Sequence, residues 1–480
     1  MAISRFIPHL AAMALLASGV AVSCRQPSGK SAGPTPPNPS TAPLSYASVV
    51  DRVAPAVITI RSSRVVRAPQ QFPFFMDPFF QRFFGGRMPS APDGGAQIER
   101  GLGSGVIVRS DGHILTNHHV IDGAEEIKVD LNDHRTFSAK VVGSDAPSDL
   151  AVLKIDANNL PTLTLGDSDK VHVGDICLAI GNPLGIGETV TAGIISAKGR
   201  STGLSNGAFE DFLQTDAPIN RGNSGGALVN TNSELIGINS QIISPTGGNI
   251  GIGFAIPSNM AKTVMEQLIQ RGSVRRGHLG VSIQPITSDL AASLGLKSTE
   301  GVLVGGVAPG GPADKAGIKT GDVITQLNGS NIRDPNAFRN AIASTAPGTD
   351  VTLTIVRNGQ QQQIHAKLDE LSGSENPQTQ SGGGSGGGQL GLRVQPITPE
   401  LAEQLGIPNV KKGLVVMSVD PTGPAAEAGI QAGDVLVEIN RQAVNSVEDV
   451  RAALRKSGNR PALVLINRGG QTAFVTIRAR

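Results

Sequence analysis

Residues 220–226 read Asn-Arg-Gly-Asn-Ser-Gly-Gly, and they are the most informative stretch of this 480-residue chain. Ser224 has Gly222 two places before it and is followed by Gly225 and Gly226. Glycines allow the backbone to bend sharply here and leave room for a substrate beside the serine hydroxyl. Gly222 also allows backbone N–H groups to converge on one point, as an oxyanion requires. The stretch therefore predicts a nucleophilic serine, although a run of small residues alone is also typical of a tight turn.

A serine hydroxyl needs a base and an orienting acid, and two upstream segments offer them. Residues 113–121 contain the adjacent His118 and His119 at the expected end of a strand, and residues 147–154 place Asp149 at the start of an apolar strand. Because neighbouring side chains of a strand point to opposite faces, only one of these histidines should face the aspartate. The chain order His, Asp, Ser is that of chymotrypsin, not that of subtilisin or the α/β-hydrolases.

Three segments together resemble the HtrA, or Do-like, serine proteases. They are residues 116–120 around the histidines, 148–153 around the aspartate and 215–228 around the serine. Gly-Ile-Gly-Phe-Ala-Ile-Pro at 251–257 follows where that family closes its barrel, and the resemblance extends over residues 46–480. It implies a mainly β fold, in which a chymotrypsin-like double β-barrel protease domain is followed by two α+β PDZ domains.

The resemblance assigns roles to the three central residues. Ser224 is expected to attack the scissile carbonyl, His119 to take its proton, and Asp149 to orient the imidazole and stabilise its charged form. His119 matches the family position of the base, so His118 is expected to point away and to be structural. A protein that had lost the activity would lack one of the three residues, and none is missing.

The resemblance also assigns residues around this triad. The N–H groups of Gly222 and Ser224, with Asn223 beside them, would form the oxyanion hole. Arg200 matches the position of an activation sensor, the alternative being a solvated surface charge. Three isoleucines would line the pocket for the residue before the cleaved bond, and such a shallow apolar pocket favours valine or alanine over lysine or arginine. These residues are Ile219, Ile242 and Ile243.

The C-terminal part of the chain is a duplicated unit. Gln-Pro-Ile-Thr at 284–287 recurs at 395–398, and Ala-Gly-Ile-Lys-Thr-Gly-Asp-Val at 316–323 recurs in similar form at 428–435. The offsets are 111 and 112 residues. A Gly/Ser run at 381–388 separates the copies, so the pattern predicts two modules on a flexible tether.

Each copy resembles a PDZ domain of the HtrA type, with helices expected at about 335–344 and 446–457. Such a domain receives a terminal carboxylate on loop N–H groups while the peptide adds a strand to a sheet edge. Alternatively, either copy is a spacer or an oligomer contact. Gln389 in the second loop replaces His278 of the first. The residues assigned to peptide binding are His278, Leu279, Gly280 and Val281 in the first copy, and Leu390, Gly391 and Leu392 in the second.

The N-terminus predicts export. An apolar stretch at 6–22 is short for a membrane span, so residues 1–23 are interpreted as a signal peptide. The Ala-Val-Ser-Cys sequence that ends at Cys24 resembles a lipoprotein processing site, which makes Cys24 a lipidation candidate. The alternative is ordinary cleavage that leaves a free thiol. Residues 24–45 contain six prolines and are expected to form an extended linker.

Composition restricts the remaining possibilities. A net charge of +2 with scattered basic residues indicates no nucleic-acid partner, and 39% hydrophobic residues indicate a globular chain. No metal or cofactor is expected. Cys177 lies in an apolar run and is expected in the core, so no disulfide is predicted. The expected organisation is a signal peptide (1–23), a Pro-rich linker (24–45), a protease domain (46–272), a first PDZ domain (274–371), a Gly/Ser linker (372–388) and a second PDZ domain (389–480).

The family resemblance implies an ATP-independent serine endoprotease of the bacterial envelope, in the periplasm, that acts on misfolded or unfolded proteins. The alternatives are a regulatory protease with one signalling target, or a protein that is mainly a chaperone or PDZ scaffold. Residues 72–84 contain seven of the fourteen phenylalanines. They occupy the position of the loop through which Do-like protease trimers join, which implies homotrimers and higher assemblies. The alternative is that these residues form extra core.

Overall fold

The computed structural model of the protein describes most of the chain beyond its N-terminal unit, which ends at Tyr46. Several predicted features lie outside the described residues: the signal peptide, the Pro-rich linker with Cys24, the phenylalanine-rich run at 72–84, Ile243, the Gly/Ser linker and Gln389. The described residues are 45–66, 97–182, 188–203, 209–220, 222–242, 249–371, 390–407, 409–457 and 461–478.

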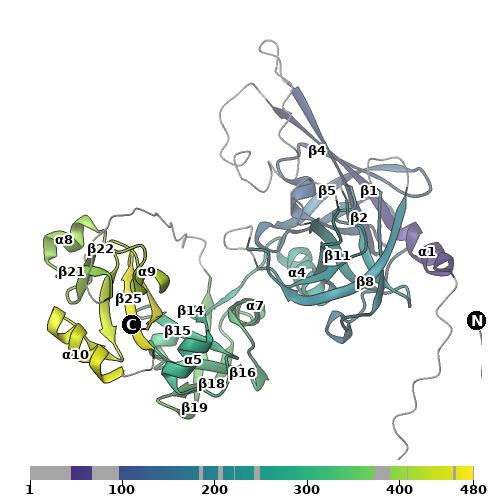
Figure 1. The fold of residues 1–480 in the computed structure, drawn as a ribbon. Helices are drawn as coiled ribbons and strands as arrows, with labels where there is room; N and C mark the ends of the chain where they lie inside the picture. The colour runs from purple at the N-terminus through teal and green to yellow at the C-terminus, as the bar shows by residue number, and fades with distance from the viewer. Residues whose placement is uncertain are drawn as a thin grey trace, which may run out of the picture. The chain divides into compact units, whose positions relative to one another are not determined.

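The first half of the protease domain is a closed barrel of antiparallel strands in the order β1-β2-β3-β6-β5-β4 (Figure 1). Alternating apolar side chains fill it, and Ile60, Val129 and Leu153 are fully buried. The strands are β1 (Val57–Val66), β2 (Gln97–Arg109), β3 (His113–Thr116), β4 (Glu126–Asp130), β5 (Thr136–Asp145) and β6 (Leu150–Ile155).

The second half is another closed barrel, in the order β10-β11-β12-β9-β8-β7. Cys177 is fully buried in its core, as expected, and burial raises the pKa of its thiol to about 11. The strands are β7 (Ile176–Gly181), β8 (Thr189–Arg200), β9 (Phe212–Thr215), β10 (Ala227–Asn230), β11 (Leu235–Ile242) and β12 (Gly253–Pro257).

The 14-residue helix α4 (Ser258–Arg271) closes the protease domain. It packs on β5 and β6 of the first barrel and on β11 and β12 of the second through a buried apolar stripe. Gly272 ends it in the left-handed conformation (φ 74°) and donates its N–H to the Leu268 carbonyl. The shorter helices are α1 (Ala47–Val53), η1 (Ala54–Ala56), α3 (His118–Ile121), η3 (Ala146–Ser148) and η4 (Ser168–Lys170).

The first repeat forms a sheet in the order β14-β15-β16-β18-β19, and its β14 is an edge strand. The helix predicted at 335–344 is α7, which begins after Asp334 caps the Ala337 N–H. The elements are β13 (Gly277–His278), β14 (Val281–Pro285), α5 (Ser288–Leu294), β15 (Val302–Val307), α6 (Pro312–Lys315), β16 (Val323–Leu327), β17 (Ser330–Asn331), α7 (Pro335–Ser344), β18 (Asp350–Arg357), β19 (Gln360–Lys367) and β20 (Asp369–Glu370).

The second repeat has the same topology, in the order β21-β22-β23-β25-β26, with β21 at the edge. The helix predicted at 446–457 is α10. The elements are β21 (Leu392–Pro396), α8 (Pro399–Gln404), β22 (Leu414–Val419), α9 (Pro424–Glu427), β23 (Val435–Ile439), β24 (Gln442–Ala443), α10 (Val447–Ser457), β25 (Ala462–Arg468) and β26 (Gln471–Ile477).

The duplicated Gly-Asp-Val motif has the same structural role in both repeats. Asp322 is buried and lies 2.6 Å from an Arg357 nitrogen, while Asp434 lies 2.6 Å from Arg468. Each aspartate also accepts a backbone N–H from the turn that precedes it. The buried carboxylate is therefore paired with an arginine and hydrogen-bonded, as a charge in the protein interior must be.

The mainly β architecture predicted from the sequence is confirmed.

Candidate active site

The expected nucleophile lies in the loop between β9 and β10 of the second barrel. Gly222 and Gly225 adopt positive φ values of 95° and 83°, which explains why glycine stands on both sides of the serine. A Cβ added at Gly225 would lie 2.1 Å from the Ser104 carbonyl oxygen. Ser224 is buried, and its hydroxyl donates to the Ser240 carbonyl oxygen at 3.0 Å.

The two adjacent histidines lie in the short helix α3, so the prediction that they end a strand is wrong. Asn117 has an extended backbone and stands at the N-terminus of this helix, directly after β3. In a helix, successive side chains diverge by about 100°, so two neighbours still face different surroundings. His119 Nδ1 lies 2.9 Å from both carboxylate oxygens of Asp149, whereas His118 Nδ1 lies 2.6 Å from Ser144 Oγ.

The aspartate is oriented by its own unusual backbone. Asp149 follows the single turn η3 and has a left-handed conformation, with φ 54°. The turn is capped by Asp145, which accepts the Ser148 N–H at 3.1 Å. The Asp149 carbonyl accepts from the Asn117 side chain at 2.9 Å and from the His118 N–H at 3.1 Å. These contacts tie the aspartate to the start of α3, so the carboxylate faces the His119 ring.

The His119–Asp149 pair is coupled electrostatically. Burial opposes charge on Asp149, but the charge of His119 and hydrogen bonds from His119 and Ser240 together hold the pKa of this carboxyl below its usual range. Burial also disfavours charge on His119, and the Asp149 carboxylate outweighs this effect and raises the pKa of the imidazole. The aspartate therefore stays ionised and increases the basicity of the histidine.

Ser240 of β11 is a member of the site that the sequence analysis missed. Its hydroxyl donates to Asp149 Oδ2 at 2.9 Å, and its carbonyl accepts the Ser224 hydroxyl. It is a serine inside a fully buried strand, and no local motif distinguishes it. Only the closeness of β11 to both Asp149 and Ser224 reveals its position.

The backbone around the nucleophile is tied to both barrels. Ser104 of β2 donates its N–H to the Ser224 carbonyl at 2.8 Å and its hydroxyl to the Gly222 carbonyl at 2.6 Å. The Asn223 N–H donates to the Asn220 carbonyl at 3.0 Å, so this expected oxyanion donor is engaged within its own turn. The arrangement suits acyl transfer, because Ser240 links Ser224 to the His119–Asp149 pair and a turn of backbone N–H groups surrounds the serine.

Known proteins share this organisation. Residues 103–238 match the trypsin-like peptidase domain, and residues 277–368 and 415–468 each match a PDZ domain. The chain is 42% identical over 449 residues to a probable periplasmic serine endoprotease, DegP-like, of Chlamydia muridarum, with 90% of this chain and 88% of the relative covered. It is also 42% identical to the periplasmic pH-dependent serine endoprotease DegQ of Escherichia coli, with 92% of each covered.

The chain belongs to the HtrA family of serine endoproteases. Its activity is that of a serine endopeptidase. A solved structure of the HtrA-type protease AlgW with a decapeptide matches with a TM-score of 0.55 and 47% identity, over 69% of this chain and all of that one.

Two of the residues assigned to the specificity pocket of this HtrA protein lie in the described part of the second barrel. Ile219 and Ile242 are both buried in the same apolar cluster. A Cβ added at Gly253 would lie 3.0 Å from Ile219 Cδ1, so the glycine leaves this side chain in place. Arg200, the expected sensor, is at the end of β8, where its Nε donates to Gln214 Oε1 at 3.1 Å.

The two PDZ loops have matching backbone hydrogen bonds. In the first, the buried Leu279 accepts the Ala313 N–H at 2.9 Å, and Gly280 has φ 77°. In the second, Leu390 accepts the Ala425 N–H at 3.1 Å, and Gly391 has φ 70°. His278 lies in β13, directly before the first loop, whereas Val281 and Leu392 begin the edge strands β14 and β21.

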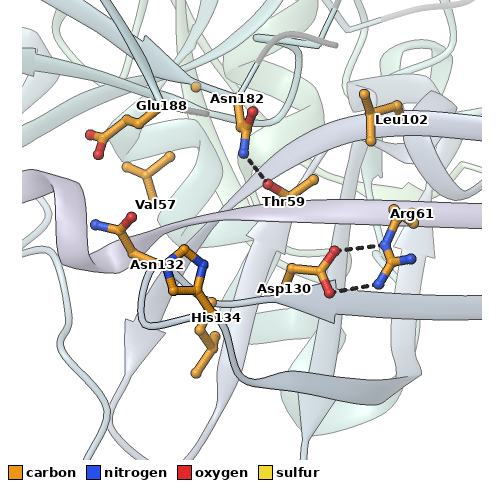
Figure 2. A pocket seen from close by; sticks show the side chains of 11 residues that line it. Val57, Thr59, Arg61, Leu102, Asp130, Asn132, His134, Asn182 and Glu188 are labelled. Atoms are coloured by element: carbon orange, nitrogen blue, oxygen red, sulfur yellow. Dashed lines mark hydrogen bonds and ion pairs between the residues drawn. The ribbon is translucent and has the colours of Figure 1, made fainter. Parts of the chain in front are cut away.

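A hollow of about 530 Å³ is lined by residues of both barrels, among them Thr59 of β1 and Gly181 of β7. Figure 2 shows Arg61 and Asp130 joined by two hydrogen bonds and the Asn182 amide donating to Thr59. Its lining contains no residue of the triad, so we assign the chemistry to the triad and not to this hollow. Within the described part of the chain, no helix is long and apolar enough to cross a membrane, and no group of side chains suits a metal ion.

Proposed function

We propose that this HtrA protein is an ATP-independent endoprotease of the bacterial periplasm that degrades misfolded or unfolded proteins. One observation supports the proposal most: a hydrogen-bonded group of His119, Asp149, Ser240 and Ser224 on a domain followed by two PDZ repeats. The relatives named as periplasmic serine endoproteases share this domain order over most of their length.

In the proposed mechanism, Ser224 is the nucleophile, His119 the base and Asp149 the orienting acid. The Ser224 hydroxyl turns from the Ser240 carbonyl toward the imidazole. Its oxygen attacks the scissile carbonyl as the proton passes to His119. The imidazolium then donates this proton to the leaving amine, and water releases the acyl-enzyme by the same steps in reverse.

The oxyanion is stabilised by backbone N–H groups of the nucleophile turn. We assign this role to Gly222 and Ser224, with Asn223 contributing if its N–H leaves the Asn220 carbonyl. In serine proteases, one such donor stabilises the transition state by about 2.7–4 kcal/mol.

The substrate is selected by its side chain before the cleaved bond. We assign this selection to Ile219 and Ile242, which are buried and apolar, and by the family resemblance to Ile243; a site without charge favours valine or alanine. Because apolar fit discriminates by only about 1–3 kcal/mol, many unfolded sequences would be cut. Arg200 is proposed to transmit activation, since it sits at the end of a strand that pairs with β9.

Both PDZ repeats are proposed to bind peptides, the first through His278, Leu279, Gly280 and Val281. Each has an edge strand next to a loop with a left-handed glycine, as addition of a peptide strand requires. The protein is further proposed to form trimers that join through residues 72–84, and to be tethered to the envelope membrane through a lipidated Cys24.

The decisive test compares degradation of unfolded casein by the wild type and by Ser224→Ala, with a fluorophosphonate label on Ser224. We expect degradation and labelling in the wild type and neither in the variant. Suppression of aggregation is measured beside it, because the alternative of a chaperone or scaffold predicts that both proteins suppress aggregation while neither degrades casein. A wild type that cuts only one folded target would favour the regulatory alternative.

A further inference from the structure

The two PDZ repeats differ at one corner of the proposed groove, where the peptide loop meets the turn before a short helix. In the first repeat the Ala308 N–H donates to the Gly280 carbonyl at 2.9 Å. In the second the Asp420 N–H donates to the Gly391 carbonyl at 2.7 Å. The two positions are therefore equivalent, and a carboxylate replaces a methyl group.

The side chain at this corner starts directly against the loop glycine. A Cβ added at Gly391 would lie 2.9 Å from the Asp420 Cβ, and one added at Gly280 would lie 3.5 Å from the Ala308 Cβ. Asp420 Oδ1 accepts both the N–H and the hydroxyl of Thr422, each at 2.9 Å. The backbone N–H of Thr422 and then its hydroxyl hold the pKa of the Asp420 carboxyl below its usual range, so it is charged at neutral pH.

In each repeat an aspartate carboxylate accepts a backbone N–H of this turn, but the aspartate follows the turn in the first repeat and begins it in the second. In the first repeat the Gly310 N–H donates to Asp314 Oδ2 at 2.8 Å, and Asp314 belongs to α6. In the second repeat the equivalent N–H, that of Thr422, is taken by Asp420. An aspartate carboxylate thus stabilises this turn in both repeats, but only in the second repeat does that carboxylate lie beside the peptide loop.

The net charge of the turn and the short helix is also more negative in the second repeat than in the first. The short helix of the first repeat contains Asp314 and Lys315, one acid and one base. In the second repeat the turn and helix contain Asp420 and Glu427 and no basic residue. A negatively charged ligand group is therefore disfavoured at the second corner relative to the first.

The apolar walls of the groove are retained in the second repeat. Its edge strand β21 and helix α10 pack side chains against one core cluster, as β14 and α7 do in the first. The second groove therefore still suits an extended apolar segment. The corresponding residues are Val281, Ile283, Phe338 and Ile342 in the first repeat, and Leu392, Val394, Val450 and Leu454 in the second.

We infer that the second PDZ repeat rejects peptide carboxyl termini and binds internal apolar segments of unfolded chains, because Asp420 stands beside its peptide loop. The inference rests on the proposed binding of peptides by both repeats. A terminal carboxylate at this loop would meet a like charge, which in water is worth about a 3- to 30-fold loss of affinity. An internal segment presents a neutral peptide group at the same point and avoids this loss.

The test uses the full chain with Ser224→Ala, which prevents digestion of the probe. Two apolar peptides of the same sequence are compared, one ending in a free carboxylate and one in a carboxamide. Each contains a photo-crosslinking residue, and mass spectrometry assigns the label to residues 277–285 or 390–396 over a range of concentrations. We expect the carboxylate peptide to label the first repeat at lower concentration, and the carboxamide peptide to label the second about 3- to 30-fold more tightly than its acid form.

Two matched variants identify the cause. Asp420→Asn keeps an acceptor for Thr422 and removes only the charge, so binding of the acid form to the second repeat should tighten about 3- to 30-fold while the carboxamide is unchanged. Ala308→Asp should weaken binding of the acid form to the first repeat. An unchanged ratio in Asp420→Asn, or a second repeat that prefers the acid form, overturns the inference while peptide binding stands. No saturable labelling of either repeat overturns the proposed peptide binding itself, and the inference with it.

Discussion

The two barrels of the protease domain differ in how fully their catalytic side chains are already arranged for the reaction. The first barrel holds the proposed base and acid as a hydrogen-bonded pair, with His119 Nδ1 2.9 Å from both oxygens of Asp149. The second holds the proposed nucleophile, but the Ser224 hydroxyl donates to Ser240 of its own barrel. The pair that accepts the proton is therefore formed within one barrel, whereas attack requires the Ser224 hydroxyl to leave the Ser240 carbonyl.

The most severe disruption of the first barrel's contribution is the loss of its base. His119→Ala should lower kcat/KM by at least about 10³-fold, because the Ser224 hydroxyl then has no proton acceptor. His118→Ala is the matched control in the same helix, and it should retain most activity because this ring contacts Ser144 instead. Hydrolysis of a chromogenic peptide measures both. An inactive His118→Ala beside an active His119→Ala would reverse the assignment.

The coupling within the first barrel predicts an acid limb in the pH profile. The Asp149 carboxylate raises the pKa of His119 above its ordinary value, and only the neutral imidazole accepts a proton. We expect kcat/KM to fall about tenfold per pH unit below a midpoint that lies above about 6.5. Asp149→Asn, which removes the charge, should shift the midpoint downward. A midpoint at or below the ordinary value would show that the pair is not coupled in this way.

The hydrogen bonds of Ser240 link Asp149 of the first barrel to Ser224 of the second, and substitutions of Ser240 test this link. Ser240→Ala removes the hydroxyl that donates to Asp149 but keeps the carbonyl that receives Ser224. A hydrogen bond to a charged group is worth about 1.5–3 kcal/mol, so we expect kcat to fall about tenfold or more with KM little changed. Ser240→Thr restores the hydroxyl and should recover most of the rate and the position of the acid limb. Equal rates for Ser240→Ala and the wild type would remove Ser240 from the site.

The specificity pocket tests what the second barrel adds besides the nucleophile. Peptides with valine or alanine before the cut should exceed those with lysine by about tenfold in kcat/KM, because buried Ile219 and Ile242 offer a cation no partner. Sequencing the fragments of digested casein measures the preference without a designed substrate. Cuts mainly after lysine or arginine would contradict the pocket.

A partly buried carboxyl group directly before β9, that of Asp211, predicts a smaller, structural effect in the second barrel. Burial and the nearby carboxylates of Asp169 and Asp334 raise the pKa of Asp211 to about 6, while Lys198 opposes the shift. The folded state therefore binds a proton more tightly than the unfolded state, and stability falls as the pH rises from about 4 to 6. Asp211→Asn should raise the free energy of unfolding by about 1–3 kcal/mol at pH 8.

Chemical denaturation at pH 8 and at pH 4 measures this effect. The gain should be largely lost at pH 4, where Asp211 is protonated in the folded protein and only about half ionised in the unfolded chain. Asp133→Asn is a suitable control, since that carboxyl is fully exposed and pairs with Arg135. A gain of equal size at both pH values would point to packing and not to charge.

Much of the fold was predictable because its signals are local. Alternating apolar runs indicate strands, and the duplicated Gly-Asp-Val turn indicates two related modules, since each pattern depends on neighbours along the chain. The exception is instructive. His118 and His119 were expected to end a strand, but they form a one-turn helix whose start is tied to the Asp149 carbonyl. That contact joins residues 32 positions apart, so no local pattern announces it.

The sequence alone was enough to single out Ser224, Asp149 and the pair His118 and His119 as candidates, because each lies in a short motif with local causes. The resemblance to the HtrA family was needed to choose His119 from the pair. Folding into closed barrels was needed to bring Ser240 within 2.9 Å of Asp149, 91 residues away, and to turn the Ser224 hydroxyl toward the Ser240 carbonyl. Folding of the second PDZ repeat was likewise needed to place Asp420 beside Gly391. The physical reason is that such contacts depend on strand register and chain closure, which long-range packing sets and no neighbouring residue specifies.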